Sequence, residues 1–238
     1  MNLYRYCPYK FYLAYVKKLR QKENIHLLRG IIIHQVLSDF ISSENARDAT
    51  LDYSQLRDQL LFSLKSEWLA NKERFLKLAL QPQDMAFYFH DSERMLINWL
   101  HSYLKHKLYE YPKPQTEIML FSRADKVCGR IDAVYKVNGT PIIIDFKTSK
   151  YPIIDANLRM QLGIYAWLYE ANFGVRPKVA VHFVTQKDGL KIFPLTDKTL
   201  AHTKRQVQQL QHKLTQLKGP EDFPCTCRVH KACEKDFY

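Results

Sequence analysis

The sequence lacks an apolar run long enough to span a membrane, and it has no separate basic amphipathic segment that would anchor it to one. Its first residues, Met1 to Tyr6, contain no apolar segment of the kind that a secretory signal peptide requires. A phosphate-binding loop of the form Gly-x-x-x-x-Gly-Lys-Ser/Thr is also absent, so any ATP-driven motor would have to be another chain. We therefore expect a cytoplasmic protein that makes no use of a membrane.

The composition is that of a folded, basic protein without internal repeats or low-complexity segments. With 238 residues, 46% of them hydrophobic, the chain can enclose one sizeable core and an appended subdomain. The formal net charge is +12 and the sequence pI is about 9.4. Clustered Lys and Arg side chains bind phosphate backbones by releasing counterions, so this charge favours nucleic acid as the partner.

The first half of the chain reads as helical, because its apolar residues recur at intervals of three and four. Pro112 and Pro114 then interrupt the pattern. We predict helices at residues 8–20, 29–42, 51–80 and 84–109.

The second half alternates strands with helices. We predict a strand at 116–121, a hairpin around residues 138 and 139, a helix at 155–173, strands at 178–184 and 190–195, and a helix from 196 or 197 to 218. This order predicts an α/β (α+β) fold with a mixed sheet flanked by helices. We expect a helical region at 1–115, a core at 116–218 and a cysteine-rich tail at 219–238 that packs with the N-terminus.

The most informative segment is the hairpin that carries Asp132 and Asp145. Asn138-Gly139 between strand-like runs predicts a type I′ turn, which needs positive φ at both central residues. A two-residue loop fixes the strand register, and counting outward puts Asp132 directly opposite Asp145. Opposed carboxylates repel each other unless a cation lies between them, so the pair predicts a divalent metal site.

Lys147 follows Asp145 by two residues, so it points to the same face of the strand and can carry positive charge beside the metal. In an arbitrary hairpin, two acids and a lysine would be interpreted as an ordinary solvated surface. The apolar run Ile142 to Ile144 argues against that alternative, because it is typical of a strand buried on both faces. Such a strand does not end in charged residues without a use for them.

Two motifs of this segment, Gly129-Arg-Ile-Asp132 and Ile144-Asp-Phe-Lys147-Thr-Ser149, resemble those of the PD-(D/E)XK nuclease superfamily, and within it the RecB-like exonucleases. Gly30-Ile-Ile-Ile-His34-Gln-Val-Leu37 resembles the N-terminal histidine motif of that branch, and Gln161-Leu-Gly-Ile-Tyr165 resembles its glutamine-tyrosine motif. Taken alone, His34 would be interpreted as a core histidine. Gln161 and Tyr165, taken alone, are equally compatible with ordinary helix packing. The resemblance covers nearly the whole chain and implies a restriction-endonuclease-like fold.

The resemblance also implies roles for individual residues. His34, Asp132, Asp145 and the backbone carbonyl of Phe146 are expected to hold one or two Mg²⁺ or Mn²⁺ ions. Catalytic roles are expected for Asp132, Asp145, Lys147, Gln161 and Tyr165. Because Gln161 and Tyr165 are four residues apart, they share one helical face and can reach the site together.

The sequence has five cysteines, and a disulfide framework is not expected in a reducing compartment. The segment around Cys7 and the run Cys225-Thr-Cys227-Arg-Val-His-Lys-Ala-Cys233 resemble the clasp of the iron-sulfur nucleases, which implies a [4Fe-4S] cluster held by these four thiolates. Family members usually place two residues between the first two C-terminal cysteines, so Cys225 is the least secure ligand. Zinc is the chemical alternative, with His230 able to replace a cysteine. We expect Cys128 to be a small buried hydrophobic residue.

The function implied by the resemblance is metal-dependent DNA exonuclease activity, on single-stranded DNA or single-stranded ends and in the 5′ to 3′ direction. The chain resembles the stand-alone CRISPR-associated exonucleases, which process DNA in antiviral defence, and CRISPR integrase proteins are then expected partners. Two alternatives stay open: a nuclease subunit of a helicase-nuclease repair complex, and a catalytically silent DNA-binding scaffold with zinc in place of iron-sulfur. The aromatic and basic residues between Tyr4 and Tyr12 could stack on unpaired bases or could simply pack the region around the cluster.

Overall fold

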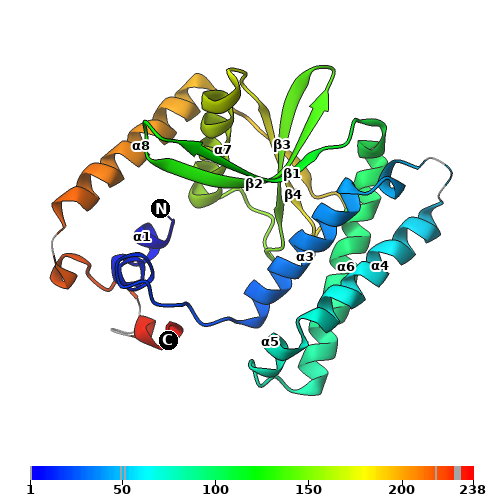
Figure 1. The fold of residues 1–238 in the computed structure, drawn as a ribbon, viewed down its shortest axis with the longest axis horizontal. Helices are drawn as coiled ribbons and strands as arrows, with labels where there is room; N and C mark the ends of the chain where they lie inside the picture. Colours follow the sequence, from blue (N-terminus) through cyan, green and yellow to red (C-terminus); the bar gives the residue numbers. More distant parts are fainter. Residues whose placement is uncertain (1, 49, 51, 218, 228–231) are drawn as a thin grey trace. The chain divides into compact units, whose positions relative to one another are not determined.

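The computed structural model describes residues 2–48, 50, 52–217, 219–227 and 232–238 (Figure 1). It contains two compact units. One unit is the continuous segment Ile25–Thr196, and the other combines Met1–Asn24 with Asp197–Tyr238. Among the described residues, no helix has the length and the apolar character that crossing a membrane would require.

The larger unit is built on a five-stranded sheet in the order β1-β2-β3-β4-β5. Strands β3 and β4 run parallel, and the other neighbouring strands are antiparallel. The predicted mixed sheet and the predicted order of strands and helices along this part of the chain are therefore confirmed. The strands are Gln115–Ser122 (β1), Val127–Val137 (β2), Thr140–Lys147 (β3), Lys178–Phe183 (β4) and Leu190–Phe193 (β5).

The hairpin of β2 and β3 has the predicted turn and register. Asn138 and Gly139 have φ values of 49° and 77°, as a type I′ turn requires. The paired residues run from Val137 opposite Thr140 to Ala133 opposite Ile144. The next position in this register places Asp132 across from Asp145.

Helices cover both faces of the sheet. Helix α7 packs on β1 to β4, whereas α3 packs on β1 and β2 and also contacts α4 and α6 (Figure 1). The helices of this unit are Ile25–Ser42 (α3), Tyr53–Ala70 (α4), Lys72–Leu76 (α5), Pro82–Lys105 (α6) and Ala156–Phe173 (α7).

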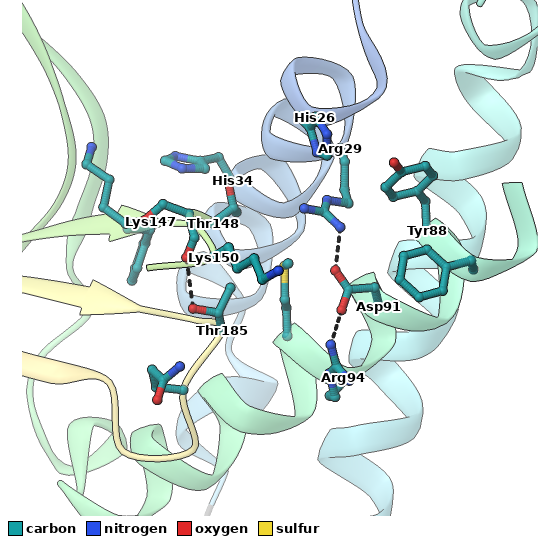
Figure 2. A pocket seen from close by; sticks show the side chains of 15 residues that line it. His26, Arg29, His34, Tyr88, Asp91, Arg94, Lys147, Thr148, Lys150 and Thr185 are labelled. Carbon is teal, nitrogen blue, oxygen red and sulfur yellow. Dashed lines mark hydrogen bonds and ion pairs between the residues drawn. The ribbon is translucent and has the colours of Figure 1, made fainter. Parts of the chain in front are cut away.

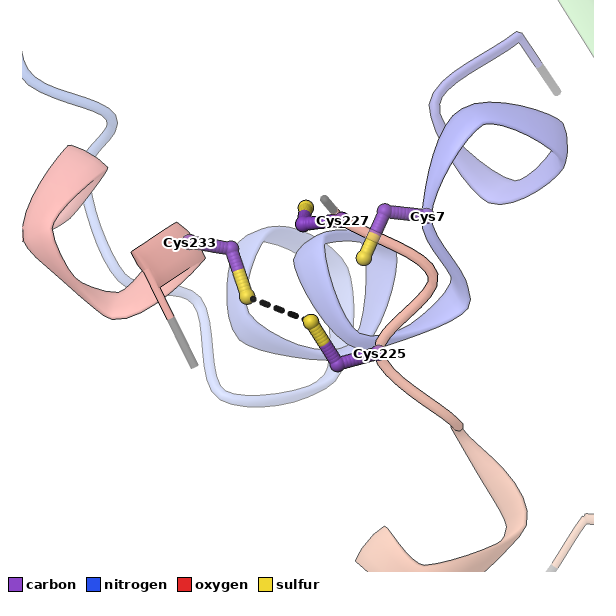
Figure 3. A group of neighbouring side chains, drawn as sticks. All are labelled: Cys7, Cys225, Cys227 and Cys233. Carbon is purple, nitrogen blue, oxygen red and sulfur yellow. Dashed lines mark hydrogen bonds between the residues drawn. The ribbon is translucent and has the colours of Figure 1, made fainter. Parts of the chain in front are cut away.

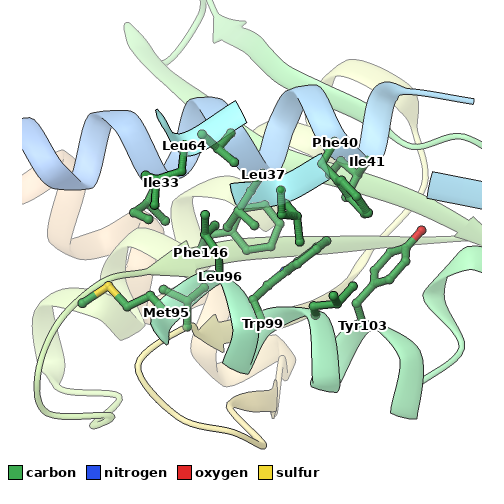
Figure 4. Close-up of a cluster of buried hydrophobic side chains, with 14 of the residues drawn as sticks. Ile33, Leu37, Phe40, Ile41, Leu64, Met95, Leu96, Trp99, Tyr103 and Phe146 are labelled. Carbon is green, nitrogen blue, oxygen red and sulfur yellow. The ribbon is translucent and has the colours of Figure 1, made fainter. Parts of the chain in front are cut away.

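Alternation along β3 separates the core from the polar site. Phe146 faces α3 and α6. Its ring meets Trp99 of α6 at a centroid distance of 6.4 Å within a large apolar cluster (Figure 4). Asp145, its neighbour, points to the opposite face and meets Gln161 of α7. The strand is thus anchored by apolar packing on one face while its carboxylate is presented on the other.

Several of the predicted helices have different bounds in the structure. The predicted helix at 51–80 is wrong as a single element, because it breaks at Asn71, whose side-chain amide donates to the carbonyl of Glu67 at 2.8 Å. This hydrogen bond satisfies a carbonyl at the end of α4 and lets α5 start in a new direction. The predicted helix at 29–42 begins earlier, at Ile25.

The smaller unit contains short N-terminal helices and the long α8 (Asp197–Gln216). Its N-terminal segment has α1 (Asn2–Tyr6), α2 (Pro8–Phe11) and a π-helical turn at Tyr12–Val16. The predicted helix at 8–20 is therefore too long. Lys18, two residues after the π-helical turn ends, has a φ of 57°. Tyr4 and Tyr12 are buried against Phe223, which is the packing role weighed for these aromatic residues.

A buried histidine in this fold predicts how stability depends on pH. The ring of His182 is fully buried against Trp99 and Phe146, and neither of its nitrogens has a hydrogen-bond partner among the described residues. Burial, helped by the charge of His106, lowers the pKa of His182 from 6.5 to about 3. The unfolded chain then binds a proton below pH 6.5 that the folded chain rejects, so folding is penalised as the pH falls.

We predict that wild-type protein loses roughly 2 kcal/mol more stability than a His182→Leu variant between pH 6.5 and pH 5. Urea unfolding at several pH values measures this difference. A His202→Gln variant, which changes an exposed histidine of α8, is the control and should follow the wild-type curve. Parallel curves for wild type and His182→Leu would show that His182 is not the residue responsible.

Candidate metal centre and cysteine cluster

Two buried carboxylates lie side by side where β2 and β3 leave their regular pairing. Beyond the pair formed by Ala133 and Ile144, the acceptor is a side chain instead of a backbone carbonyl: the backbone N–H of Phe146 donates to Asp132 Oδ2 at 2.7 Å. The exposed fractions of Asp132 and Asp145 are 8% and 1%. The two acids thus follow the last regular pair of the hairpin, with both carboxylates largely removed from water.

Asp145 is held by the lysine and the glutamine that the sequence singled out. Lys147 Nζ lies 2.7 Å from Asp145 Oδ2, and Gln161 Nε2 lies 3.4 Å from Oδ1. The same amide nitrogen donates to the hydroxyl of Tyr165 at 2.7 Å. Helix α7 thus brings its four-residue pair to the carboxylate as its periodicity predicted.

Glycine at position 129 suits this close packing. A Cβ atom at Gly129 would lie 3.2 Å from the ring of Tyr165 and 3.1 Å from Leu168, which is closer than side chains normally approach. The first residue of the Gly129-Arg-Ile-Asp132 motif therefore lets α7 approach β2 closely.

The two carboxylates differ in acidity because their surroundings differ. Burial raises the pKa of Asp145 to about 6, the nearby charge of Lys147 opposes the rise, and Asp132 adds to it. Burial also acts to raise the pKa of Asp132, but the hydrogen bond and charge of His34 and the N–H of Phe146 outweigh it and leave the pKa below its usual range. Two neighbouring acids whose pKa values are driven apart are typical of functional sites.

His34 reaches the carboxylates from α3. Its Nδ1 lies 3.4 Å from Asp132 Oδ1, and its ring stands edge-on to Phe146 at a centroid distance of 6.2 Å. Burial lowers the pKa of His34, but the hydrogen bond that its ring donates to Asp132 and the charges of Asp132 and Asp145 raise it above its ordinary value. A histidine held against a carboxylate in this way is oriented as a metal ligand requires.

Glu117 is a candidate ligand that the sequence did not reveal. Thr116 pairs with Ala133 and Ile118 with Ile131, so Glu117 lies across from Asp132 in the register of β1 and β2. Its φ of 53° marks a local distortion of the strand. Burial and the charge of Asp132 raise the pKa of Glu117, although Arg130, whose Nε lies 3.0 Å from Glu117 Oε2, opposes the rise.

These residues offer a suitable set of donors for a divalent metal. His34, Glu117 and Asp132 can each present one ligand atom such that all three atoms lie within 4.8 Å of one another. Asp145 adds a carboxylate beside them, although its oxygens are turned toward Lys147 and Gln161. Hard carboxylate oxygens with one imidazole suit Mg²⁺ or Mn²⁺. The backbone carbonyl of Phe146 as a further ligand stays a prediction.

The four cysteines expected to form a clasp converge in the smaller unit. Ligand atoms of Cys7, Cys225, Cys227 and Cys233 all lie within 4.8 Å of one another (Figure 3). Backbone contacts join the segments that carry them: the N–H of Lys22 donates to the carbonyl of Asp236 at 2.7 Å. Such a cluster of thiols can hold a metal ion or an iron-sulfur centre.

The cysteine thiols cannot all ionise without a cation among them. Burial acts to raise the pKa of Cys7, yet hydrogen bonds from the backbone N–H groups of Lys10 and Thr226 bring it down to about 7. Burial and the neighbouring Cys225 raise the pKa of Cys233 to about 12. A bound metal ion offsets the repulsion between neighbouring thiolates, because the thiolates become its ligands.

Two further expectations about this chemistry have different outcomes. Cys128 is exposed on β2, so the expectation that it is a buried hydrophobic residue is wrong. His230, the alternative zinc ligand, lies outside the described residues.

The comparisons agree with the geometry. The profile of the PD-(D/E)XK nuclease superfamily matches residues 1–235, and the chain belongs to this superfamily. A crystal structure of the "Putative exonuclease" of Eubacterium rectale superposes with a TM-score of 0.54 at 14% sequence identity, over 91% of this chain and 76% of that one. At this identity the likeness concerns the fold. A second solved structure, SSO0001, has a TM-score of 0.30 and 18% identity, over 78% of this chain and 85% of that one.

Among curated proteins, the Gene 69 protein of Mycobacterium phage L5 is 38% identical over 88 residues. The match spans 36% of this chain and 29% of the phage protein. It therefore relates a segment of each protein and leaves most of the phage protein unmatched.

The position of Glu117 predicts a contribution to metal binding. We predict that Glu117→Gln weakens Mn²⁺ binding roughly tenfold or more, because one charged oxygen ligand is lost. Isothermal titration of the protein with Mn²⁺ measures the affinity directly. Glu110→Gln removes an exposed carboxylate that pairs with Lys107, and this control variant should bind as wild type does. Equal affinities for all three proteins would exclude Glu117 as a ligand.

The cysteine cluster predicts a second bound centre that is independent of Mn²⁺. We predict that Cys7→Ser and Cys225→Ser lower the content of bound iron or zinc in protein purified without oxygen, whereas Cys128→Ser leaves it unchanged. Elemental analysis gives the metal, and a brown colour with visible absorption distinguishes iron-sulfur from colourless zinc. Retention of the full metal content by Cys225→Ser would remove that residue from the ligand set.

Proposed function

We propose that this protein is a metal-dependent DNA exonuclease that hydrolyses phosphodiester bonds of single-stranded DNA or of single-stranded ends. The observation that carries the proposal is the convergence of His34, Glu117 and Asp132 beside the Asp145–Lys147 pair. Membership of the nuclease superfamily and the net charge of +12 support it. Digestion in the 5′ to 3′ direction is part of the proposal and derives from the resemblance to CRISPR-associated exonucleases.

His34, Glu117, Asp132 and Asp145 would hold Mg²⁺ or Mn²⁺, together with the carbonyl of Phe146. When bound, such an ion polarises the phosphate, promotes ionisation of water and stabilises the leaving oxygen. The protein contributes the enclosure of these ligands, because burial keeps competing water away from the carboxylates and strengthens every charge interaction there.

Lys147 would be the cation at the reacting phosphate in this proposal. Its Nζ is already held 2.7 Å from Asp145, so little reorientation is needed to orient a water molecule or offset the charge that develops on the phosphate. Gln161 fixes the Asp145 carboxylate from the other side, and Tyr165 fixes Gln161 in turn. Gln161 and Tyr165 therefore act as positioning residues in this mechanism.

The proposed biological setting is the processing of DNA ends in CRISPR adaptation or in DNA repair. In the first setting the partners would be integrase proteins, and in the second a helicase with which this chain forms a nuclease subunit. Co-purification from the native host distinguishes the two. The cysteine cluster would stabilise the smaller unit as a [4Fe-4S] or zinc centre in either setting.

The reaction itself is tested with end-labelled oligonucleotides. We predict that wild-type protein shortens single-stranded DNA in the presence of Mg²⁺ or Mn²⁺, and that Asp145→Asn is slower by roughly a hundredfold or more. Asp84→Asn changes an exposed carboxylate of α6 and serves as the control. Labels at the 5′ and 3′ ends report the direction of digestion, and a duplex of the same sequence reports strand preference.

Two results would contradict this function. DNA that stays intact with both metals would leave the catalytically silent scaffold as the better description. Equal cleavage by wild type and Asp145→Asn would show that the activity arises elsewhere.

A further inference from the structure

A basic cavity of about 820 Å³ opens beside the candidate metal centre (Figure 2). Its walls come from α3, α6 and the segments that follow β3 and β4. His34, Phe146 and Lys147 belong to both the cavity and the metal centre. Whatever occupies the cavity therefore extends directly to the proposed site of hydrolysis.

The exposed charge in this cavity is positive. Arg29, Arg94, Lys147 and Lys150 line it, and Asp91 is the one acidic residue of the described lining. The Asp91 side chain is only 12% exposed and is held between Arg29 and Arg94 (Figure 2). The Arg94 side chain is 71% exposed, so its charge remains accessible to a ligand. This lining suits an occupant that carries several phosphates.

The cavity also presents an aromatic ring to solvent. Phe87, on α6, lines it with 63% of its surface exposed. Tyr88 holds one edge of this ring, with a centroid distance of 5.4 Å and an interplanar angle of 75°. Tyr88 is itself fixed by the guanidinium of Arg29, 5.5 Å from its ring centre, and by the ring of His26 at 5.5 Å. An exposed and supported apolar ring among phosphate-binding cations is the surface on which an unpaired base stacks.

A smaller cavity of about 370 Å³ lies on the other side of His34. It is lined by Glu117 and Arg130, and it shares His26, His34 and Thr148 with the larger cavity. The proposed metal ligand therefore stands at the border between two openings. A strand that runs from one cavity into the other has a phosphate at that border.

We infer that the larger cavity is a subsite for unpaired nucleotides next to the scissile phosphate, in which Phe87 stacks on a base while Arg94 and Lys150 contact the backbone. The inference rests on the proposed nuclease function. It adds a physical reason why the enzyme would prefer single-stranded DNA to duplex DNA. In a duplex each base is already stacked and paired, so its face is closed to Phe87. A single strand or a frayed end offers that face without unpairing.

The test measures binding separately from cleavage. Fluorescence anisotropy follows a labelled single-stranded oligonucleotide binding to the full protein in buffer without added divalent metal. We predict that Phe87→Ala binds roughly 5- to 150-fold more weakly than wild type, and that Phe87→Trp binds as well as wild type. Phe62→Ala is the matched control, because Phe62 is a helical phenylalanine with 72% of its surface exposed that does not line this cavity.

A second set of oligonucleotides identifies the stacking interaction itself. Moving a single abasic position along the strand should reveal one position at which wild type loses affinity and Phe87→Ala does not. Duplex DNA of the same sequence should bind wild type and Phe87→Ala equally. The subsite is wrong if Phe87→Ala binds single strands as Phe62→Ala does, or if it loses the same affinity for duplex.

Cleavage assays on the same variants separate this inference from the proposed function. If wild type and Phe87→Ala cut and bind single strands equally well, the nuclease stands and the subsite falls. If wild type cuts no DNA at all, the nuclease proposal falls, and the abasic series still decides whether Phe87 stacks on a base.

Discussion

The structure of the candidate site depends on the burial of two like charges in neighbouring strands. Asp132 and Asp145 are almost inaccessible to water, and unpaired carboxylates in such surroundings are strongly unfavourable. Each one is therefore tied to a polar partner: Asp132 to His34 of α3 and to the N–H of Phe146 in β3, and Asp145 to Lys147 of its own strand. The need to compensate these charges fixes α3, β2 and β3 relative to one another.

Apolar packing holds this polar arrangement in place. Phe146 lies between the two acids in the site and the core, because its N–H binds Asp132 while its ring packs on Trp99. Gln161 and Tyr165 add a hydrogen-bonded chain from α7 on the other face of the sheet. Because both sides of β3 are packed, the carboxylates are positioned before any ligand binds, which is the condition for efficient electrostatic stabilisation.

Features governed by local rules were predictable from the sequence. A two-residue Asn-Gly turn allows one register, so the pairing of β2 with β3 followed directly, and the four-residue spacing placed Gln161 beside Tyr165. Glu117 was not predictable, because the loop between β1 and β2 carries no comparable rule that fixes their register. The break at Asn71 accompanies a local side-chain hydrogen bond, and the exposure of Cys128 depends on tertiary surroundings; periodicity encodes neither.

The position of Phe87 relative to the metal centre depends on one long-range ion pair. Arg29 precedes His34 by five residues on α3, and Asp91 follows Phe87 by four residues on α6. The largely buried contact between Arg29 and Asp91 joins these two helices and, together with the apolar core between them, helps to hold Phe87 and His34 in their relative positions. Arg29 also supports Tyr88, which holds Phe87. In the proposed function, Arg29 would thereby link the helix that carries the base-stacking residue to the helix that carries a metal ligand.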